Sequence, residues 1–223
     1  MTHIETMQHK GYTIDIYYDE HAESPREWDN LGTMACYHGR YTLGDDKQYE
    51  DADALREYLE THADEVYQLP IYIYEHGGIT ISTSPFGCDW DSGQLGVIYV
   101  TKEKAQAEGF KCEERVLNSL EQEVKTYDDF LRGNVYGFKV LDPDGLELDS
   151  CWGFVGDMEF CINEAMAVAE YFDNKTPKQY ELDFVSHINE YGVALDGYGN
   201  EVRQEDGSIV IIPQEHRHQY QVI

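Results

Sequence analysis

The sequence predicts an α+β fold whose sheets are mainly antiparallel. Two observations lead to this class. Segments rich in β-forming residues follow one another through short turns that contain glycine, which is typical of hairpins. Helical patterns lie between them, but without the regular alternation of strand and helix that a parallel sheet needs. We therefore expect hairpins packed against three or four helices.

The first half of the chain combines one helical pattern with several strand patterns. Residues 51–65 predict a helix, because apolar residues recur there near helical spacing, and Pro70 is expected to end it. The Gly77-Gly78 pair tolerates the positive φ of a tight hairpin turn. Segments in which Tyr, Ile, Val and Thr are frequent predict strands at 11–18, 34–43, 71–76, 78–83 and 95–101.

The second half begins with helices and continues with a hairpin. Residues 102–110 predict a short helix and 157–172 a longer one. The strands expected at 134–142 and 146–155 flank Pro143-Asp144-Gly145, a turn in which proline presets one residue and glycine accepts the next. The strongest helical pattern is 113–132, with an apolar stripe of Val116, Leu117, Leu120, Val124, Tyr127 and Leu131.

The chain is expected to form one main domain with an extension. Residues 1–175 contain the helices and most of the strand patterns, and predict an α+β core domain. Residues 176–223 alternate short β-like pieces with glycine-rich turns, and no Pro/Ser-rich linker precedes them. We interpret this tail as a β-rich extension packed on or near the core, and not as an independent domain.

The composition excludes several classes of protein. The 223 residues include 44 Asp and Glu against 16 Lys and Arg, which gives a formal net charge of −28 and a pI of about 4.4. DNA, RNA and anionic membranes repel such a chain, so we expect no direct binding to any of them. A hydrophobic content of 41% is enough for a folded core and argues against disorder.

The sequence also predicts a cytoplasmic protein with reduced thiols. It has no apolar run of about 18 residues, and its start lacks the basic and apolar regions of a signal peptide. No Cys-x-x-Cys pair occurs, which argues against a zinc knuckle or a disulfide framework, and we expect no metal or cofactor. The five cysteines are Cys36, Cys88, Cys112, Cys151 and Cys161.

The acidic residues are concentrated in two parts of the chain. Residues 50–101 contain ten acids and one base, and residues 140–223 contain seventeen acids and four bases. Residues 102–139 are nearly neutral. The two groups proposed to contact a partner are Asp53, Glu57, Glu60 and Asp64, which fall on one face of the expected helix, and Asp142, Asp144, Glu147 and Asp149 near the hairpin turn.

This charge has two interpretations. A net charge of −28 equals the phosphate charge of about 14 base pairs, so a rigid acidic surface could occupy the basic groove of a nucleic-acid-binding protein. Eighteen tyrosines fit that reading, because amphipathic aromatics are frequent in interfaces. Alternatively, acidic helix faces are simply solvated and keep the protein soluble. The sequence alone leaves both interpretations open.

Catalytic signatures are absent from the sequence. There is no GxxxxGK[ST], no strand-linked GxGxxG, no HExxH and no GxSxG. Residues 83–96 contain Cys88 and Asp91, weak catalytic candidates that His76 could approach. Zinc binding by these residues with Cys36 and His38 is conceivable, but the spacing is not specific. We favour a structural loop with capping aspartates, a core cysteine and a core Trp90.

Residues 24–34, SPREWDNLGTM, predict a loop that is held by an ion pair. Arg26 is one of few bases, so we expect it to pair with an Asp or Glu and to fix the loop. Trp28 in the same loop could also serve as a contact residue.

The blocks SPREWDNLGTM, CDWDSGQLGVIYV and DSCWGFVG are similar to those of a family of acidic proteins from bacteriophages, prophages and plasmids. The resemblance covers roughly residues 10–175 and excludes the tail. No activity is attached to that family, so it implies no catalytic residues. It implies a mobile genetic element in a bacterial cytoplasm, where acidic proteins often inhibit restriction or CRISPR effectors as DNA mimics.

The first hypothesis is therefore a non-enzymatic protein that binds and inhibits a basic, nucleic-acid-binding host defence protein. The alternatives are a small metal- or thiol-dependent hydrolase that uses the loop from Cys88 to Asp91, and an accessory phage protein that is acidic only for solubility. The sequence leaves the oligomeric state open, and a homodimer is compatible with it.

Overall fold

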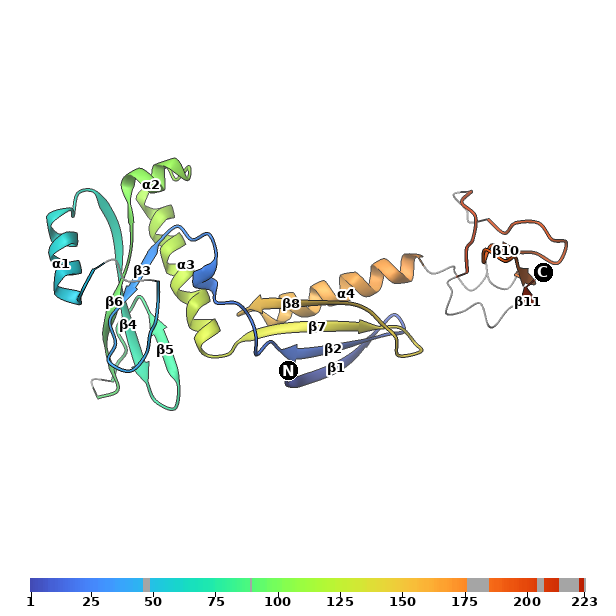
Figure 1. The fold of residues 1–223 in the computed structure, drawn as a ribbon, viewed down its shortest axis with the longest axis horizontal. Coiled ribbons are helices and arrows are strands. Elements are labelled where there is room, and N and C mark those ends of the chain that lie inside the picture. The colour runs from blue at the N-terminus through green and yellow to red at the C-terminus, as the bar shows by residue number, and fades with distance from the viewer. Residues whose placement is uncertain (46–48, 89, 176–184, 204–206, 213–220, 223) are drawn as a thin grey trace. The chain divides into compact units, whose positions relative to one another are not determined.

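The computed structural model describes residues 1–45, 49–88, 90–175, 185–203, 207–212 and 221–222 (Figure 1). The fold is α+β with antiparallel sheets, as the sequence predicts. The chain divides into two compact units, Met1–Ala165 and Met166–Ile223. This division lies inside helix α4 (Met158–Lys175), whereas the sequence analysis placed the boundary after residue 175.

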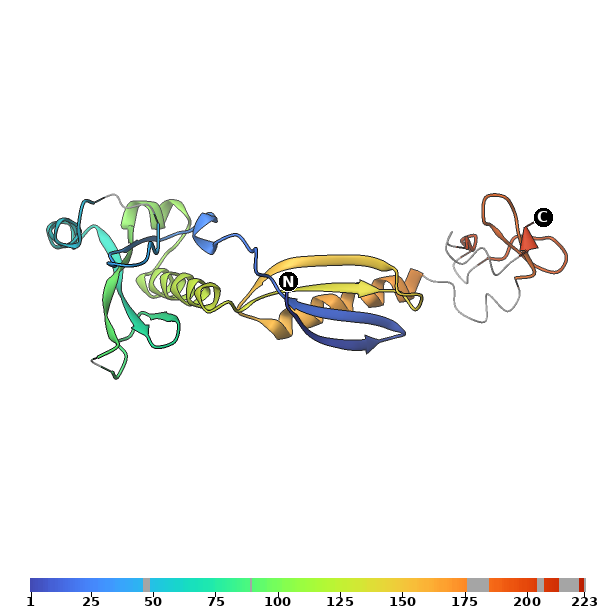
Figure 2. The ribbon, with the colours of Figure 1, turned by 60° about the horizontal axis from the view of Figure 1, so that its bottom comes forward.

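Sheet A has the strand order β1-β2-β7-β8, and every neighbouring pair is antiparallel (Figure 2). Strand β1 was not expected, because its sequence HIETMQH contains few strong β-formers. The hairpin predicted around Pro143 is confirmed, and Gly145 has a φ of 85° in its turn. The four strands are β1 (His3–His9), β2 (Tyr12–Tyr18), β7 (Val135–Leu141) and β8 (Glu147–Val155).

Residues 19–134 are inserted between two neighbouring strands of sheet A. The chain leaves the sheet after Tyr18 and returns at Val135, and the amide of Asp19 donates a hydrogen bond of 2.8 Å to the Val135 carbonyl. The two ends of the insert therefore meet at one place, which lets it fold as a compact layer of its own.

Sheet B forms the centre of this insert, with the strand order β3-β6-β4-β5. The strand expected at 34–43 is shorter in the structure. Pro70 was expected to end the first helix, but it lies inside strand β4, so that prediction is wrong. Proline is tolerated there because β5 pairs only with Tyr72–Glu75, which leaves β4 with one hydrogen-bonded neighbour at Pro70. The strands are β3 (Thr33–Cys36), β4 (Val66–Glu75), β5 (Ile79–Ser82) and β6 (Ser92–Thr101).

Two helices cover opposite faces of sheet B (Figure 1). Helix α3 (Glu113–Leu131) packs on one face, and its predicted stripe is buried at Val116, Leu120, Val124 and Tyr127. Helix α1 (Ala52–Thr61) packs on the other face through Leu55 and Leu59. The expected helix of 51–65 therefore ends four residues early. The short helix α2 (Lys102–Ala107) follows β6 directly.

Arg26 holds the loop before β3 on helix α3, as the sequence predicts for an internal ion pair. Its guanidinium binds Asp45 through two hydrogen bonds of 2.7 and 2.8 Å, Glu123 at 2.9 Å and the Gly32 carbonyl at 2.8 Å. Burial opposes its charge, but the two carboxylates outweigh burial and hold the pKa of Arg26 above its ordinary value. The same carboxylates accept backbone amides, Asp45 from Met34 and Glu123 from Leu31 and Gly32.

The backbone around this network leaves no room for larger residues. A Cβ on Gly32 would lie 2.5 Å from a methyl carbon of Leu120. Gly44 has a φ of 75°, and a Cβ there would lie 2.4 Å from the Met34 carbonyl oxygen. Its amide donates to the Tyr127 hydroxyl at 3.2 Å. The loop and α3 therefore fit together through close backbone contact as well as through charge.

One face of sheet A is apolar and the other is polar and aromatic. Ile14 and Ile16 of β2 and Val140 of β7 are fully buried. Phe138 contacts Phe154, whose ring contacts Phe160 in the first turn of α4 at 5.9 Å, so α4 begins on this buried face. Residues that alternate with these ones point to the opposite face.

In its described residues, the second unit contains three short strands, β9 (His187–Ile188), β10 (Ala194–Leu195) and β11 (Gln221–Val222). Backbone hydrogen bonds run from Ala194 to Val210, from Val210 to Val202 and from Val202 back to Ala194, which closes a ring. Ile188, Ala194, Val210 and Ile212 form a buried cluster of their own. In the part of the chain that the structure describes, no helix is long and apolar enough to cross a membrane.

Replacing Arg26 with methionine leaves Asp45 and Glu123 as unpaired and largely buried carboxylates. We expect Arg26→Met to lower the free energy of unfolding by about 3–5 kcal/mol, measured by urea denaturation. Arg56→Met is the matched control, because Arg56 is 65% exposed and its pair with Asp53 contributes less than about 1 kcal/mol.

The triple variant R26M/D45N/E123Q should recover part of this loss, since its amide oxygens can still accept the backbone hydrogen bonds. Equal and small losses in Arg26→Met and Arg56→Met would contradict the anchoring role of Arg26.

Candidate functional site

The outer face of α1 is an exposed acidic surface. Asp51 is the N-cap of the helix and accepts hydrogen bonds from the amides of Asp53 and Ala54. Glu57 lies on the side of α1 away from the buried residues Leu55 and Leu59, whereas Glu60 lines, together with these two residues, a pocket of about 360 Å³ beside strands β4 and β6. Both side chains are exposed.

The remaining members of the predicted α1 group differ in their surroundings. Asp53 is 84% exposed and pairs with Arg56 at 2.9 Å. Asp64 is exposed but lies beyond the end of α1, because the helix ends at Thr61. Within the described residues, Glu57, Glu60 and Asp64 have no ion-pair partner. We call Asp53, Glu57, Glu60 and Asp64 the α1 acidic surface.

The second predicted acidic group lies at the β7–β8 hairpin of sheet A, where Asp142 is buried and the other three residues are exposed. Asp142 is 5% exposed, and its Oδ1 accepts hydrogen bonds from Asp144 at 2.9 Å and Leu146 at 2.8 Å. The sequence placed Asp142 on a partner-binding surface, and this assignment is corrected here: its carboxylate is buried and organises the turn. Glu147 pairs with Lys139 at 2.6 Å, and Asp149 accepts the amide of Ser150. Asp144 is exposed at the turn.

The weak catalytic candidates lie at the end of sheet B. His76 follows β4, and its Nδ1 lies 3.2 Å from the Asp91 carboxylate. The backbone also joins the two segments, since the Glu75 amide donates to the Asp91 carbonyl. Cys88 is half-buried, and its carbonyl accepts the Ser92 hydroxyl. The described contacts of His76 are with Asp91 and the Tyr74 ring, and none of them is with the Cys88 thiol.

Trp90 differs from the expected core residue. Its side chain is 96% exposed, so the interpretation of a loop with a core tryptophan is wrong. The aromatic packing in this region comes from Phe86, whose ring contacts Tyr74 at 5.6 Å. Trp28, the contact residue proposed in the other loop, is 47% exposed.

The zinc alternative is not supported by side-chain positions. Cys36 is buried in the core between sheet B and α3, while His38 pairs with Glu75 at 3.3 Å. Arg40 binds the same carboxylate at 2.8 Å. In the described ranges, no group of three or more His, Cys, Asp or Glu residues is arranged to hold a metal ion.

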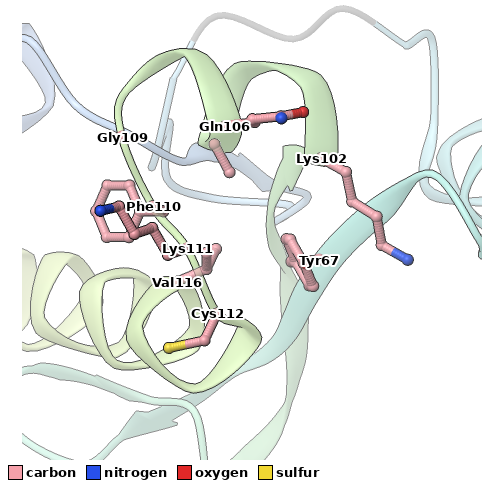
Figure 3. Close-up of a pocket in the computed structure, with 9 residues that line it drawn as sticks. Tyr67, Lys102, Gln106, Gly109, Phe110, Lys111, Cys112 and Val116 are labelled. Atoms are coloured by element: carbon pink, nitrogen blue, oxygen red, sulfur yellow. The ribbon is translucent and has the colours of Figure 1, made fainter.

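A pocket of about 540 Å³ lies between the end of α2, strand β4 and the start of α3 (Figure 3). Tyr67, Lys102 and Cys112 line it, and the Lys102 amine lies 5.3 Å from the centre of the Tyr67 ring. Figure 3 shows the Lys102 and Cys112 side chains pointing in opposite directions. The Lys102 amine and the Cys112 thiol therefore do not converge on one point, as the groups of an acid–base or nucleophilic site do.

Aromatic residues of sheet A were not singled out by the sequence analysis. Tyr17 and Trp152 contact each other at 5.8 Å on the face opposite the buried Ile14 and Ile16. The alternation in GYTIDIYY is a signal that could have placed Asp15 and Tyr17 on that face. The approach of Trp152 depends on strand pairing, which the sequence pattern does not specify.

Comparisons with models of protein families, with curated proteins and with solved structures found no match to this chain. The assignment of a site therefore rests on the geometry described above. The α1 acidic surface is the group of predicted residues that the structure keeps together, exposed and mainly unpaired.

The cysteines provide a test of the thiol-hydrolase alternative. Cys112 and Cys151 are exposed, Cys36 and Cys161 are buried, and burial raises the pKa of Cys161 to about 12. We expect iodoacetamide at neutral pH to label Cys112 and Cys151 first, Cys88 more slowly, and Cys36 and Cys161 only after unfolding. Mass spectrometry of the labelled peptides measures this order. Labelling of Cys88 ahead of Cys112, slowed by His76→Ala, would instead indicate an activated thiol.

Proposed function

We propose that the chain is a non-enzymatic acidic protein that binds a positively charged surface of a nucleic-acid-binding protein through the α1 acidic surface. One observation carries this proposal. Glu57, Glu60 and Asp64 are exposed and have no ion-pair partner in the described part of the chain. Carboxylates that their own chain does not neutralise are available to a cationic partner, and their mutual repulsion is relieved when that partner binds.

Helix α1, which carries Glu57 and Glu60, is fixed by its cap and by its packing on sheet B. Like charges three or four residues apart destabilise a helix by roughly 0.2–0.5 kcal/mol per pair. Burial of Leu55 and Leu59 against sheet B and the Asp51 cap offset this repulsion. The backbone positions that carry Glu57 and Glu60 are therefore fixed before binding, which lowers the entropic cost of an interface.

The finer part of the proposal concerns the partner. We propose a host defence protein of a bacterium, a restriction or CRISPR effector, which the chain inhibits in the cytoplasm as a DNA mimic. The net charge of −28, equal to the phosphate of about 14 base pairs, supports this choice. The resemblance of SPREWDNLGTM and CDWDSGQLG to proteins of mobile genetic elements supports the same setting.

Displacement of DNA tests this function. A labelled duplex of about 20 base pairs is bound to a basic, sequence-independent DNA-binding protein, and the chain is titrated in at several salt concentrations. We expect displacement that weakens steeply between about 50 and 500 mM salt, because counterions are released on binding. The double variant E57Q/E60Q should displace the duplex several-fold less well and with a shallower salt dependence.

The matched control is E108Q/E164Q, which removes the same charge from two other exposed residues, one at the end of α2 and one in α4. We expect this control to behave like the unsubstituted protein within about twofold, since bulk charge alone is not the cause. If both double variants lose the same activity, acidity serves solubility and general repulsion. If displacement does not change with salt, electrostatic mimicry is excluded.

A further inference from the structure

A row of aromatic side chains crosses sheet A on its polar face. His3 of β1 is paired with Tyr17 of β2, Tyr17 with Gly137 of β7, and Gly137 with Trp152 of β8. The row therefore includes one residue from each strand. The ring of His3 contacts Tyr17 at 5.3 Å, and the ring of Tyr17 contacts Trp152 at 5.8 Å.

Gly137 is the reason that Trp152 joins this row. A Cβ on Gly137 would lie 2.1 Å from ring carbon Cε3 of Trp152, so the indole occupies the space above the glycine. The indole thus lies across β7 toward Tyr17, with one ring face against the strand. Tyr17 and Trp152 are both half-buried, so part of their ring surface stays in contact with solvent.

The charged groups beside the row are mainly acidic. Asp15 is 20% exposed and accepts a hydrogen bond from Thr6. Lys139 is paired with Asp15 across the strands, but its amine binds Glu147 at 2.6 Å, which neutralises it. The imidazole of His3 lies 3.5 Å from Asp15. Asp15 therefore leaves the row with a net negative charge when His3 is neutral.

This charge distinguishes between two kinds of ligand that stack on aromatic side chains, nucleobases and guanidinium groups. Sites that stack nucleobases combine aromatic rings with a positively charged groove for the phosphates. Here the nearby charge and the whole chain, at −28, oppose phosphate. A guanidinium is planar and weakly hydrated, it stacks on Trp and Tyr rings, and it binds carboxylates.

We infer that the row His3–Tyr17–Trp152, with Asp15, binds arginine side chains of a basic protein partner. The inference rests on the proposed function and specifies its chemistry: the partner contributes arginine in preference to lysine at this face. The guanidinium would stack on Trp152 or Tyr17, while Asp15 attracts its charge. An ammonium group has the same charge but no planar surface, so it gains less from the rings.

Two peptides of equal length, an oligo-arginine and an oligo-lysine, test this inference on the full chain. At about 150 mM salt we expect the arginine peptide to bind roughly five- to tenfold more tightly than the lysine peptide. Calorimetry or anisotropy gives both dissociation constants. In Trp152→Leu the preference should fall below about twofold, whereas Trp90→Leu, which removes an exposed tryptophan elsewhere, should keep it.

Two further variants test the inference in case Trp152→Leu does not fold. Asp15→Asn and Tyr17→Leu leave the indole above Gly137 and should each reduce the preference about two- to fivefold. In the double variant W28F/W90F, the fluorescence of Trp152, the remaining tryptophan, should respond to the arginine peptide more than to the lysine peptide.

The outcomes separate this inference from the proposed function. Equal affinity of the unsubstituted chain for both peptides would overturn arginine binding at sheet A. If E57Q/E60Q still weakened both peptides in that case, the proposed function would stand. If neither peptide bound to the chain, both proposals would be overturned.

Discussion

The fold of the inserted layer depends on one guanidinium held between two carboxylates. Arg26 joins Asp45, Glu123 and the Gly32 carbonyl, so the loop before β3, the segment after it and helix α3 are fixed to one another. A buried ion network of this kind adds little net stability compared with apolar packing, but breaking it leaves charges without partners. Its main effect is therefore positional, and it sets where α3 lies on sheet B.

Bases that pair with carboxylates of the same chain, as Arg26 does, neutralise part of its negative charge. The chain has 44 acids and 16 bases, and several bases are paired with carboxylates of the same chain, among them Arg26, Arg40 and Lys139. Turn formation uses Asp142 in a similar way. Exposed carboxylates remain on several elements, among them α1, α3 and α4, and those of α1 stand on a helix that is capped by Asp51 and packed on sheet B. Sheet A adds an aromatic row with Asp15, and we propose that the two features together bind a partner that is basic and rich in arginine.

Local sequence patterns predicted much of this fold, but they do not specify contacts between residues that are far apart in the sequence. Apolar spacing identified α3, and the Pro-Asp-Gly turn identified the β7–β8 hairpin, since both depend on residues close in sequence. The sequence also predicted that Arg26 pairs internally, but Glu123 is 97 residues away and only the packing of α3 brings it near. The prediction for Pro70 was wrong because β4 tolerates a proline there only where β5 no longer pairs with it, and the sequence does not show how far β5 extends. For the site, helical spacing placed Asp53, Glu57 and Glu60 on α1, but Asp64 lies beyond the end of that helix. The burial of Asp142, the exposure of Trp90 and the contact of Tyr17 with Trp152 required the tertiary structure.

The central claim is that binding of cations is localised on the α1 acidic surface and is not spread over all exposed carboxylates. Nuclear magnetic resonance of the isotope-labelled chain, titrated with an oligo-lysine peptide, measures this directly for each amide. The account predicts that the largest shifts fall between Ala52 and Asp64 and saturate at lower peptide concentration than those of other acidic segments. Shifts of equal size and affinity at Glu108, Glu164 and the remaining exposed acids would contradict it.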